Sequence, residues 1–120
     1  MAKKVNKPIL TEAQEQCLLF EWAALKKIDT MFAIPNGGSR HILEAVNLKK
    51  QGVKKGIPDI FLATPTINYH GLFIEMKRTK GGVVSPEQKE WIAKLEKNGY
   101  CCIVCKGFEE AKDGILHYFK

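Results

Sequence analysis

The sequence predicts one mixed α/β domain in which helices flank a mixed β-sheet, and three observations support this fold class. Two segments combine a capping-box pattern with apolar residues at helical spacing, as amphipathic helices do. Several short apolar runs have the length of buried strands. The two kinds of segment follow one another in the order α-β-α-β-β-α-β-α, which argues against an all-α or all-β domain. The 120 residues are enough for one domain with its own core.

The first half of the chain is expected to hold two helices and two strands. Thr11 and Gln14 form a capping box that opens a helix over about 11–28. Two apolar rows along this helix predict that it is widely buried, with Leu10, Ala13, Cys17, Phe20, Ala24 and Ile28 in one and Leu18, Trp22 and Leu25 in the other. The next expected elements are a strand at 31–34, a turn-rich loop at 35–39, a helix at 41–51 and a strand at 60–63.

The second half begins with a strand at 72–77, close enough to the strand at 60–63 to predict an antiparallel hairpin. Ser85 and Gln88 form a second capping box, with Pro86 at the first helical position, and this helix should end near Asn98. A strand at 100–105 and a helix at 108–119 follow. We expect an N-terminal tail at 1–10 and a folded domain at 11–120.

Composition indicates a soluble globular protein. Hydrophobic residues make up 45% of the chain and charged residues 27%, and no apolar run approaches the roughly 20 residues that cross a membrane. The basic N-terminus has no apolar segment behind it, so we expect no signal peptide, no membrane partner and a cytoplasmic location.

Basic residues gather in two places, within a net charge of +6. The segment 40–55 has one acid, Glu44, and five basic residues: Arg40, Lys49, Lys50, Lys54 and Lys55. A second cluster consists of Lys77, Arg78 and Lys80. Such clusters suit a phosphate-binding surface, although two solvated faces would have the same composition.

The four cysteines do not indicate a metal or redox centre. Cys102 and Cys105 form a CxxC, but they lie inside an apolar strand and no second pair follows at zinc-finger spacing. A redox CxxC normally opens a helix. We expect these thiols to act as small buried hydrophobes.

Three charged residues at strand ends suggest phosphodiester chemistry. Asp59 opens the strand at 60–63, and Glu75 and Lys77 share one face of the next strand while Met76 points into the core. In a hairpin, Asp59 and Glu75 converge at one end of the sheet. Their oxygens suit Mg²⁺ or Mn²⁺, which would acidify a water, while Lys77 orients the nucleophile or stabilises the transition state. The alternative is a surface ion pair beside a turn aspartate.

The wider pattern resembles the VRR-NUC family, the virus-type replication-repair nucleases of the PD-(D/E)XK superfamily. The resemblance spans about residues 11–119. It is carried by Pro35-Asn36-Gly37-Gly38 with Arg40, Gly52-Val53, Gly56-Ile57-Pro58-Asp59, Phe73-Ile74-Glu75-Met76-Lys77, Ser85-Pro86-Glu87-Gln88 with Trp91, and Leu95 with Gly99-Tyr100. It implies a restriction-endonuclease-like fold of the stand-alone phage or bacterial type.

By position, the resemblance implies that Asp59, Glu75 and the Met76 carbonyl bind the metal and that Lys77 is catalytic. A further acid belongs on the first helix, where Glu12 fits best and Glu15 and Glu21 compete; a helix-dipole role for Glu12 is the alternative. Gln88 would stand near the metal, although it is also the third residue of its capping box. Expected nucleic-acid contacts are Gly38, Ser39, Arg40, Lys54, Lys55 and Arg78.

The function expected from this resemblance is a Mg²⁺- or Mn²⁺-dependent DNA endonuclease in replication, recombination or repair. It would cut branched DNA such as Holliday junctions as a homodimer, because symmetric cutting needs two sites related by a two-fold axis. The alternative is a non-catalytic nucleic-acid-binding module that retains the fold.

Overall fold

The computed structural model describes residues 8–35 and 42–120. Its elements follow the predicted order: α1 (Glu12–Leu25), β1 (Met31–Ala33), α2 (Ile42–Lys50), β2 (Ile60–Leu62), β3 (Leu72–Lys77), α3 (Pro86–Lys97), β4 (Cys101–Lys106) and α4 (Phe108–Tyr118). The mixed α/β fold class is therefore confirmed. Residues 1–7 of the expected tail, and residues 36–41 with Gly38, Ser39 and Arg40, lie outside the described residues.

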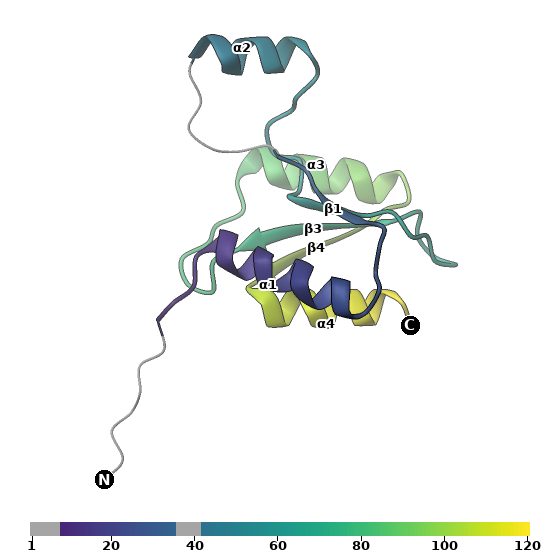
Figure 1. Ribbon diagram of the computed structural model, residues 1–120. Coiled ribbons are helices and arrows are strands. Elements are labelled where there is room, and N and C mark those ends of the chain that lie inside the picture. The colour runs from purple at the N-terminus through teal and green to yellow at the C-terminus, as the bar shows by residue number, and fades with distance from the viewer. Residues whose placement is uncertain (1–7, 36–41) are drawn as a thin grey trace.

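The four strands form one mixed sheet in the order β1-β2-β3-β4 (Figure 1). β1 pairs with β2 and β2 with β3 in antiparallel fashion, so the predicted hairpin is present. β3 and β4 are parallel, because α3 carries the chain back along the sheet between them. This crossover brings the start of α3 to the end of β3, where the chain has just passed Lys77.

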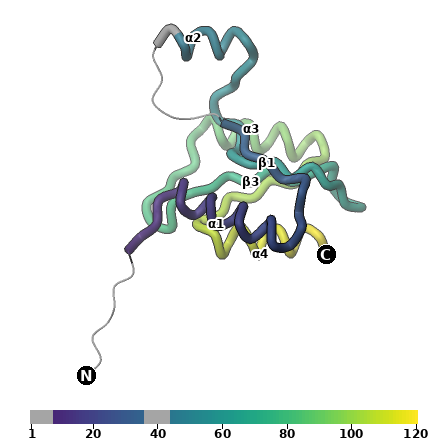
Figure 2. Tube along the Cα trace, viewed as in Figure 1, coloured from purple at the N-terminus to yellow at the C-terminus, as the bar shows by residue number. Residues whose placement is uncertain are grey.

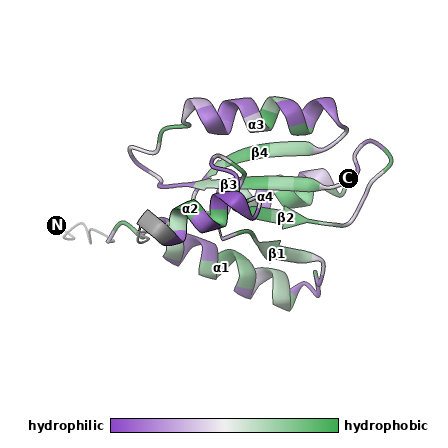
Figure 3. Ribbon diagram, turned by 90° about the horizontal axis from the view of Figure 1, so that it is seen from above, coloured by the Kyte–Doolittle hydropathy of each residue, from purple (hydrophilic) through white to green (hydrophobic). Residues whose placement is uncertain are grey.

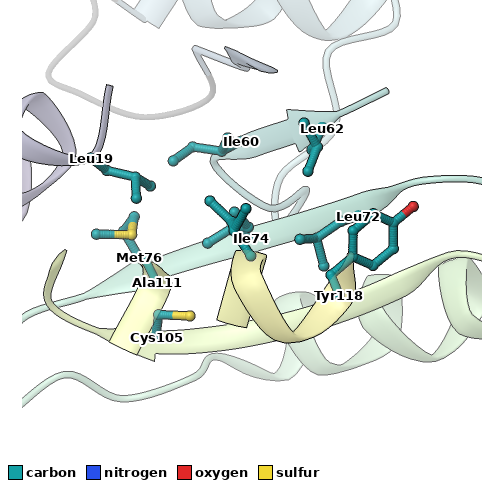
Figure 4. Close-up of a cluster of buried hydrophobic side chains, with 10 residues drawn as sticks. Leu19, Ile60, Leu62, Leu72, Ile74, Met76, Cys105, Ala111 and Tyr118 are labelled. Carbon is teal, nitrogen blue, oxygen red and sulfur yellow. The ribbon is translucent and has the colours of Figure 1, made fainter. Parts of the chain in front are cut away.

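The main core lies between one face of the sheet and two helices. In Figures 1 and 2, α1 and α4 lie side by side on this face, and α3 lies on the opposite side of the sheet. Figure 4 shows the core side chains pointing toward one another from the strands, α1 and α4. The buried members are Leu19, Ile60, Leu62, Leu72, Ile74, Met76, Cys105, Ala111, Ile115 and Tyr118.

The opposite face of the sheet divides into an aromatic part and a polar part. Phe61 and Phe73 pair across β2 and β3 with ring centroids 4.4 Å apart, and Tyr100 lies 5.4 Å from Phe73. Further along β3, the same face carries Glu75 and Lys77. The aromatic rings thus lie toward the start of β3, and the polar groups lie where β3 ends.

The first helix is less buried than the sequence predicts. Only Glu15, Leu19 and Ala23 are buried, one row four residues apart, whereas Leu18 and Leu25 are exposed. The prediction of a wide buried face is wrong because, among the described elements, α1 makes its main contacts with α4 and β3, which leaves much of its remaining surface exposed. The helix also ends at Leu25: Lys27 has φ 58°, and Ile28 N donates to Ala23 O at 2.9 Å. This is a Schellman-type end, which the apolar spacing does not reveal.

The two cysteines of the CxxC point to opposite faces of β4. Cys105 is buried in the core, while Cys102 Sγ lies 3.9 Å from Ile92 O of α3. Burial raises the pKa of each thiol to about 12. Within residues 8–35 and 42–120, no helix is long and apolar enough to span a membrane.

Candidate active site

Asp59, just before β2, is held by hydrogen bonds to both its main chain and its side chain. The fully buried Pro58 precedes it, and its main-chain carbonyl accepts a hydrogen bond from Ile34 N at 2.7 Å. Its side-chain Oδ2 accepts one from Met76 N at 2.8 Å. Since Ile60 pairs with Ile74, this register brings the carboxyl group of Asp59 beside Glu75.

Glu75, Lys77 and Gln88 form a connected polar cluster beside Asp59. Gln88 Nε2 donates to Glu75 Oε1 at 2.6 Å, and Lys77 Nζ donates to Gln88 Oε1 at 2.9 Å. Lys77 Nζ also lies 3.6 Å from Glu75 Oε1. Glu75 is 3% and Lys77 8% exposed, so both charged groups have been taken out of bulk water. A single amide therefore sets the spacing between the carboxylate and the ammonium.

Gln88 closes the capping box of α3 and also bonds the polar cluster, while a place beside a metal stays a prediction. Its Oε1 accepts from Ser85 N at 2.8 Å, and Gln88 N donates to Ser85 Oγ at 3.2 Å, which completes the capping box of α3. The same side chain bonds Glu75 and Lys77. The helix start and the polar cluster consequently share one group.

The two neighbouring carboxyl groups resist ionisation together. Burial, followed by the charge of Asp59, raises the pKa of Glu75 to about 8, although Lys77 opposes this. Burial also raises the pKa of Asp59, while the hydrogen bond from Met76 N lowers it. When Glu75 is protonated, it shares a hydrogen bond with Asp59. A positive charge between the two carboxylates, whether a proton or a metal ion, would relieve this repulsion.

One buried oxygen of the cluster is unsatisfied. In the ionised form of Glu75, Oε2 has no hydrogen-bond partner among the described residues. Burying such an oxygen unpaired is costly, and a hard cation would satisfy it. Across the described ranges, no three His, Cys, Asp or Glu side chains already converge on one point. The two carboxylates therefore fit a metal that keeps several water ligands, not one enclosed by protein groups.

The three acids of the first helix have different surroundings. Glu15 is buried and its Oε2 accepts from Phe108 N at 2.6 Å, so it caps α4, whose N-cap residue Gly107 supplies no side-chain bond. Glu21 is exposed. Glu12 is half-buried, and its charge contributes to the raised pKa of Asp59. Of the three, Glu12 is the one whose charge acts on the site.

The capping role of Glu15 was not predicted from the sequence. The available signal was indirect: a glycine stands at the N-cap of α4, so another part of the chain had to bind the free N–H groups. For Met76, the side chain is 1% exposed in the core, which leaves only its main-chain carbonyl to bind a metal.

The described candidates for nucleic-acid binding are exposed lysine and arginine side chains close in sequence to the site residues. Lys54, Lys55 and Arg78 are all exposed. Lys55 Nζ lies 3.8 Å from Glu87 Oε1 at the start of α3. Next to it, Gly56 has φ 96°, and a Cβ there would lie 2.7 Å from the Glu87 main chain, so only glycine allows this close approach.

Comparison with known proteins agrees with this geometry. The family model described as the VRR-NUC domain matches residues 3–109. This chain belongs to the VRR-NUC family. The VRR-NUC family is a family of nucleases, for which DNA is the implied class of substrate.

A solved structure supports the assignment to the VRR-NUC family. It is titled "VRR_NUC domain protein" and is 34% identical to this chain, with a TM-score of 0.82. The match covers 94% of this chain and 90% of the other. No curated protein matches the chain. The fold and the family are thus established.

Proposed function

We propose that this VRR-NUC protein is a Mg²⁺- or Mn²⁺-dependent endonuclease that hydrolyses DNA phosphodiester bonds at Asp59, Glu75, Lys77 and Gln88. The observation that carries the proposal is the unsatisfied Glu75 Oε2 beside the carboxyl group of Asp59. A purely structural network would leave no such group, because unpaired buried oxygens destabilise the fold. Family membership supplies the reaction class.

The proposed metal ligands are Asp59, Glu75, the Met76 carbonyl and Glu12. A bound Mg²⁺ or Mn²⁺ would lower the pKa of a coordinated water and offset negative charge on the phosphate. Lys77 has three N–H donors, of which one is bound to Gln88 Oε1. The others can orient the nucleophile or donate to a phosphate oxygen as charge develops. Gln88 is the positioning residue for both Lys77 and Glu75.

For the substrate, we propose branched DNA such as Holliday junctions, cut by a homodimer. One domain of this size carries one such site, and paired cuts in a four-way junction need two sites related by symmetry. Gly38, Ser39 and Arg40 stay predicted phosphate contacts, together with Lys54, Lys55 and Arg78. The rival function is a non-catalytic binding module, which predicts a broken charged cluster. The assembled Glu75–Gln88–Lys77 network argues against it.

A plasmid-nicking assay separates the enzyme from the binder. Wild type should nick supercoiled plasmid with Mg²⁺ or Mn²⁺ and stop when EDTA is added. Asp59→Asn should lose on the order of 10³-fold in rate or more, because it removes one charge from the proposed metal site. Asp29→Asn, an equal change at an exposed position, should keep full activity. Cleavage that persists in EDTA, or in Asp59→Asn, would overturn the proposal.

The substrate is tested with a panel of linear duplex, flap and four-way junction at one salt concentration. Faster cutting of the junction supports the proposed preference, and equal cutting of linear duplex removes it. The salt must be fixed because phosphate contacts make affinity strongly salt-dependent. Sedimentation equilibrium tests the homodimer directly, and a monomer at assay concentrations would remove that part of the proposal.

A further inference from the structure

The second helix stands apart from the rest of the domain. In Figures 1 and 2, α2 projects from the body, and no extensive contact joins it to another helix or strand in the described part of the chain. Figure 3, seen from above, looks onto α2 and the domain behind it. From Glu44 to Lys50 every side chain is exposed except the half-buried Leu48. A helix of nine residues gains little stability by itself in water. Its conformation would be reinforced by a partner outside the domain.

Both attachments of this helix lie at the active site. Before it, Ile34 N bonds the main-chain carbonyl of Asp59. After it, the chain passes Gly56, packed against Glu87, and arrives at Asp59 within three residues. We call residues 42–55 the α2 arm. Figure 1 shows the arm on the side of the sheet where α3 lies, which is also the side that carries Glu75, Lys77 and Gln88.

The α2 arm is strongly basic where it turns back toward the site. The helix ends in a tight turn in which Gly52 has φ 101° and Val53 N donates to Leu48 O at 3.0 Å. Four exposed lysines flank this turn, two before and two after it: Lys49, Lys50, Lys54 and Lys55. The arm contains one acidic residue, Glu44, which lies in the first turn of α2. The arm thus carries a net charge of +3, from four lysines and one glutamate.

We propose that the α2 arm is a clamp for the phosphate backbone of nucleic acid, holding the strand beside the scissile phosphate without taking part in the chemistry. The clamp rests on the proposed nuclease function. It identifies the part of the chain that holds the substrate outside the active site. Charge complementarity selects this partner: lysines that lie on an exposed arm attached at the active site match a polyanion that must pass through that site.

A second copy of the chain fits the arm less well. Two arms brought together would place four lysines near four others. Among the arm residues whose exposure the structure describes, the exposed large apolar side chains are Val46 and Val53, at 45% and 40%. Two such side chains supply little apolar area next to the roughly 800 Å² that each partner of a standard interface buries.

The test compares two triple variants with equal charge loss. The arm variant replaces Lys49, Lys50 and Lys54 by Gln. The matched control replaces the exposed Lys26, Lys97 and Lys120, which lie at the ends of α1 and α3 and at the C-terminus. Figure 1 shows these chain ends on the side of the domain opposite the end of β3. Binding to a labelled 30-base-pair duplex and to a four-way junction is measured by fluorescence anisotropy in Ca²⁺ over a salt series. Hydrolysis of bis(p-nitrophenyl) phosphate in Mn²⁺ reports the chemistry separately.

The arm variant should bind about tenfold more weakly, and its plot of log K against log salt should be shallower by roughly two to three units, about one for each lost phosphate contact. Replacement of the same three lysines by Arg should restore both values. In the double variant Lys49→Gln, Lys50→Gln, which leaves Lys54 in place, hydrolysis of the small phosphodiester should stay within twofold of wild type.

Three results would overturn the α2 clamp: unchanged affinity, an equal loss in the matched control, or a change in sedimentation that shows the arm to be a subunit contact. Failure of wild type to cleave any substrate would instead contradict the nuclease function. The anisotropy measurements would still decide whether the arm binds nucleic acid, so the two failures are distinguishable.

Discussion

The six-residue strand β3 buries apolar side chains on one face and ionisable side chains on the other. On one face, Leu72, Ile74 and Met76 are almost fully buried among apolar neighbours. On the other, Glu75 and Lys77 are nearly as buried, yet they are charged and one carboxylate oxygen lacks a partner. The first face stabilises the fold through apolar contact. The second costs stability, and costs of this kind are typical of functional sites, as expected for the metal site that we propose there.

The largest difference between the faces should appear on removal of the Lys77 charge. Lys77→Met keeps the volume of the side chain but removes the ammonium that contacts Gln88 and Glu75. We expect the cleavage rate to fall on the order of 10³-fold, in the range for loss of a transition-state donor. The control is Lys106→Met on β4, an exposed lysine directly paired with Lys77 in register. It should change the rate less than twofold; similar losses in both variants would show that Lys77 acts only through general charge.

On the core face, a truncation should affect stability and leave the chemistry of the folded protein intact. Ile74→Ala removes a fully buried side chain and should lower the free energy of unfolding by about 2–5 kcal/mol. Urea denaturation measures this loss, and Val104→Ala on the exposed part of β4 should change stability by under about 0.5 kcal/mol. If folded Ile74→Ala also lost the cleavage rate seen for Lys77→Met, the separation between the two faces would be wrong.

The polar face should make the metal-free protein less stable as the pH rises. Glu75 has a pKa of about 8 in the folded chain against an ordinary value of 4.5, so the folded state holds a proton that the unfolded state has released. This contribution to stability is complete below pH 4.5 and is lost as the pH rises through about 8. Thermal unfolding in EDTA from pH 6 to 9 should show the decline.

Glu75→Gln should flatten that decline and, at pH 9, raise stability by about 1–2 kcal/mol, because a neutral amide avoids the buried charge that Glu75 carries above its pKa of about 8. It should also abolish cleavage. Mg²⁺ should protect wild type more than this variant. An unchanged pH dependence in Glu75→Gln would mean that another group causes the decline.

The smallest expected difference concerns the two thiols of β4, one on each side of the sheet. Their pKa of about 12, against 9.0 ordinarily, leaves about 1,000-fold less thiolate at pH 8 than an unperturbed thiol has. Iodoacetamide should therefore modify the exposed Cys17 in the native protein and reach Cys102 and Cys105 only in urea. Mass spectrometry of the alkylated peptides gives the order, and early modification of Cys102 would show that α3 does not cover its face.

The fold was predicted well where a sequence pattern corresponds to a single local structure. The capping boxes at Thr11 and Ser85 fixed the starts of α1 and α3, and the short link between β2 and β3 fixed their antiparallel pairing. The burial of α1 was harder to predict. Apolar spacing shows which residues could be buried, but the number of neighbours around a helix is set by the tertiary structure.

The candidate site was predictable in its acids and less so in its connections. The alternation along β3 placed Glu75 and Lys77 on one face opposite Met76. That Gln88 joins both of them depends on the crossover through α3, which no local pattern contains. Glu15 and Glu12 are one helical turn apart and look equivalent in the sequence. Only the position of α4 shows that Glu15 is bound to Phe108 N.

Because Gln88 bonds both the polar cluster and the start of α3, a change at the cluster should alter the hydrogen bonding at the start of α3. Ser85 N is bound by the same oxygen that accepts from Lys77. Any occupant that draws Lys77 away, or holds it in place, changes how firmly that oxygen binds the Ser85 amide. The exchange rate of one backbone hydrogen with deuterium at Ser85 would then follow occupancy of the centre without any label on metal or DNA.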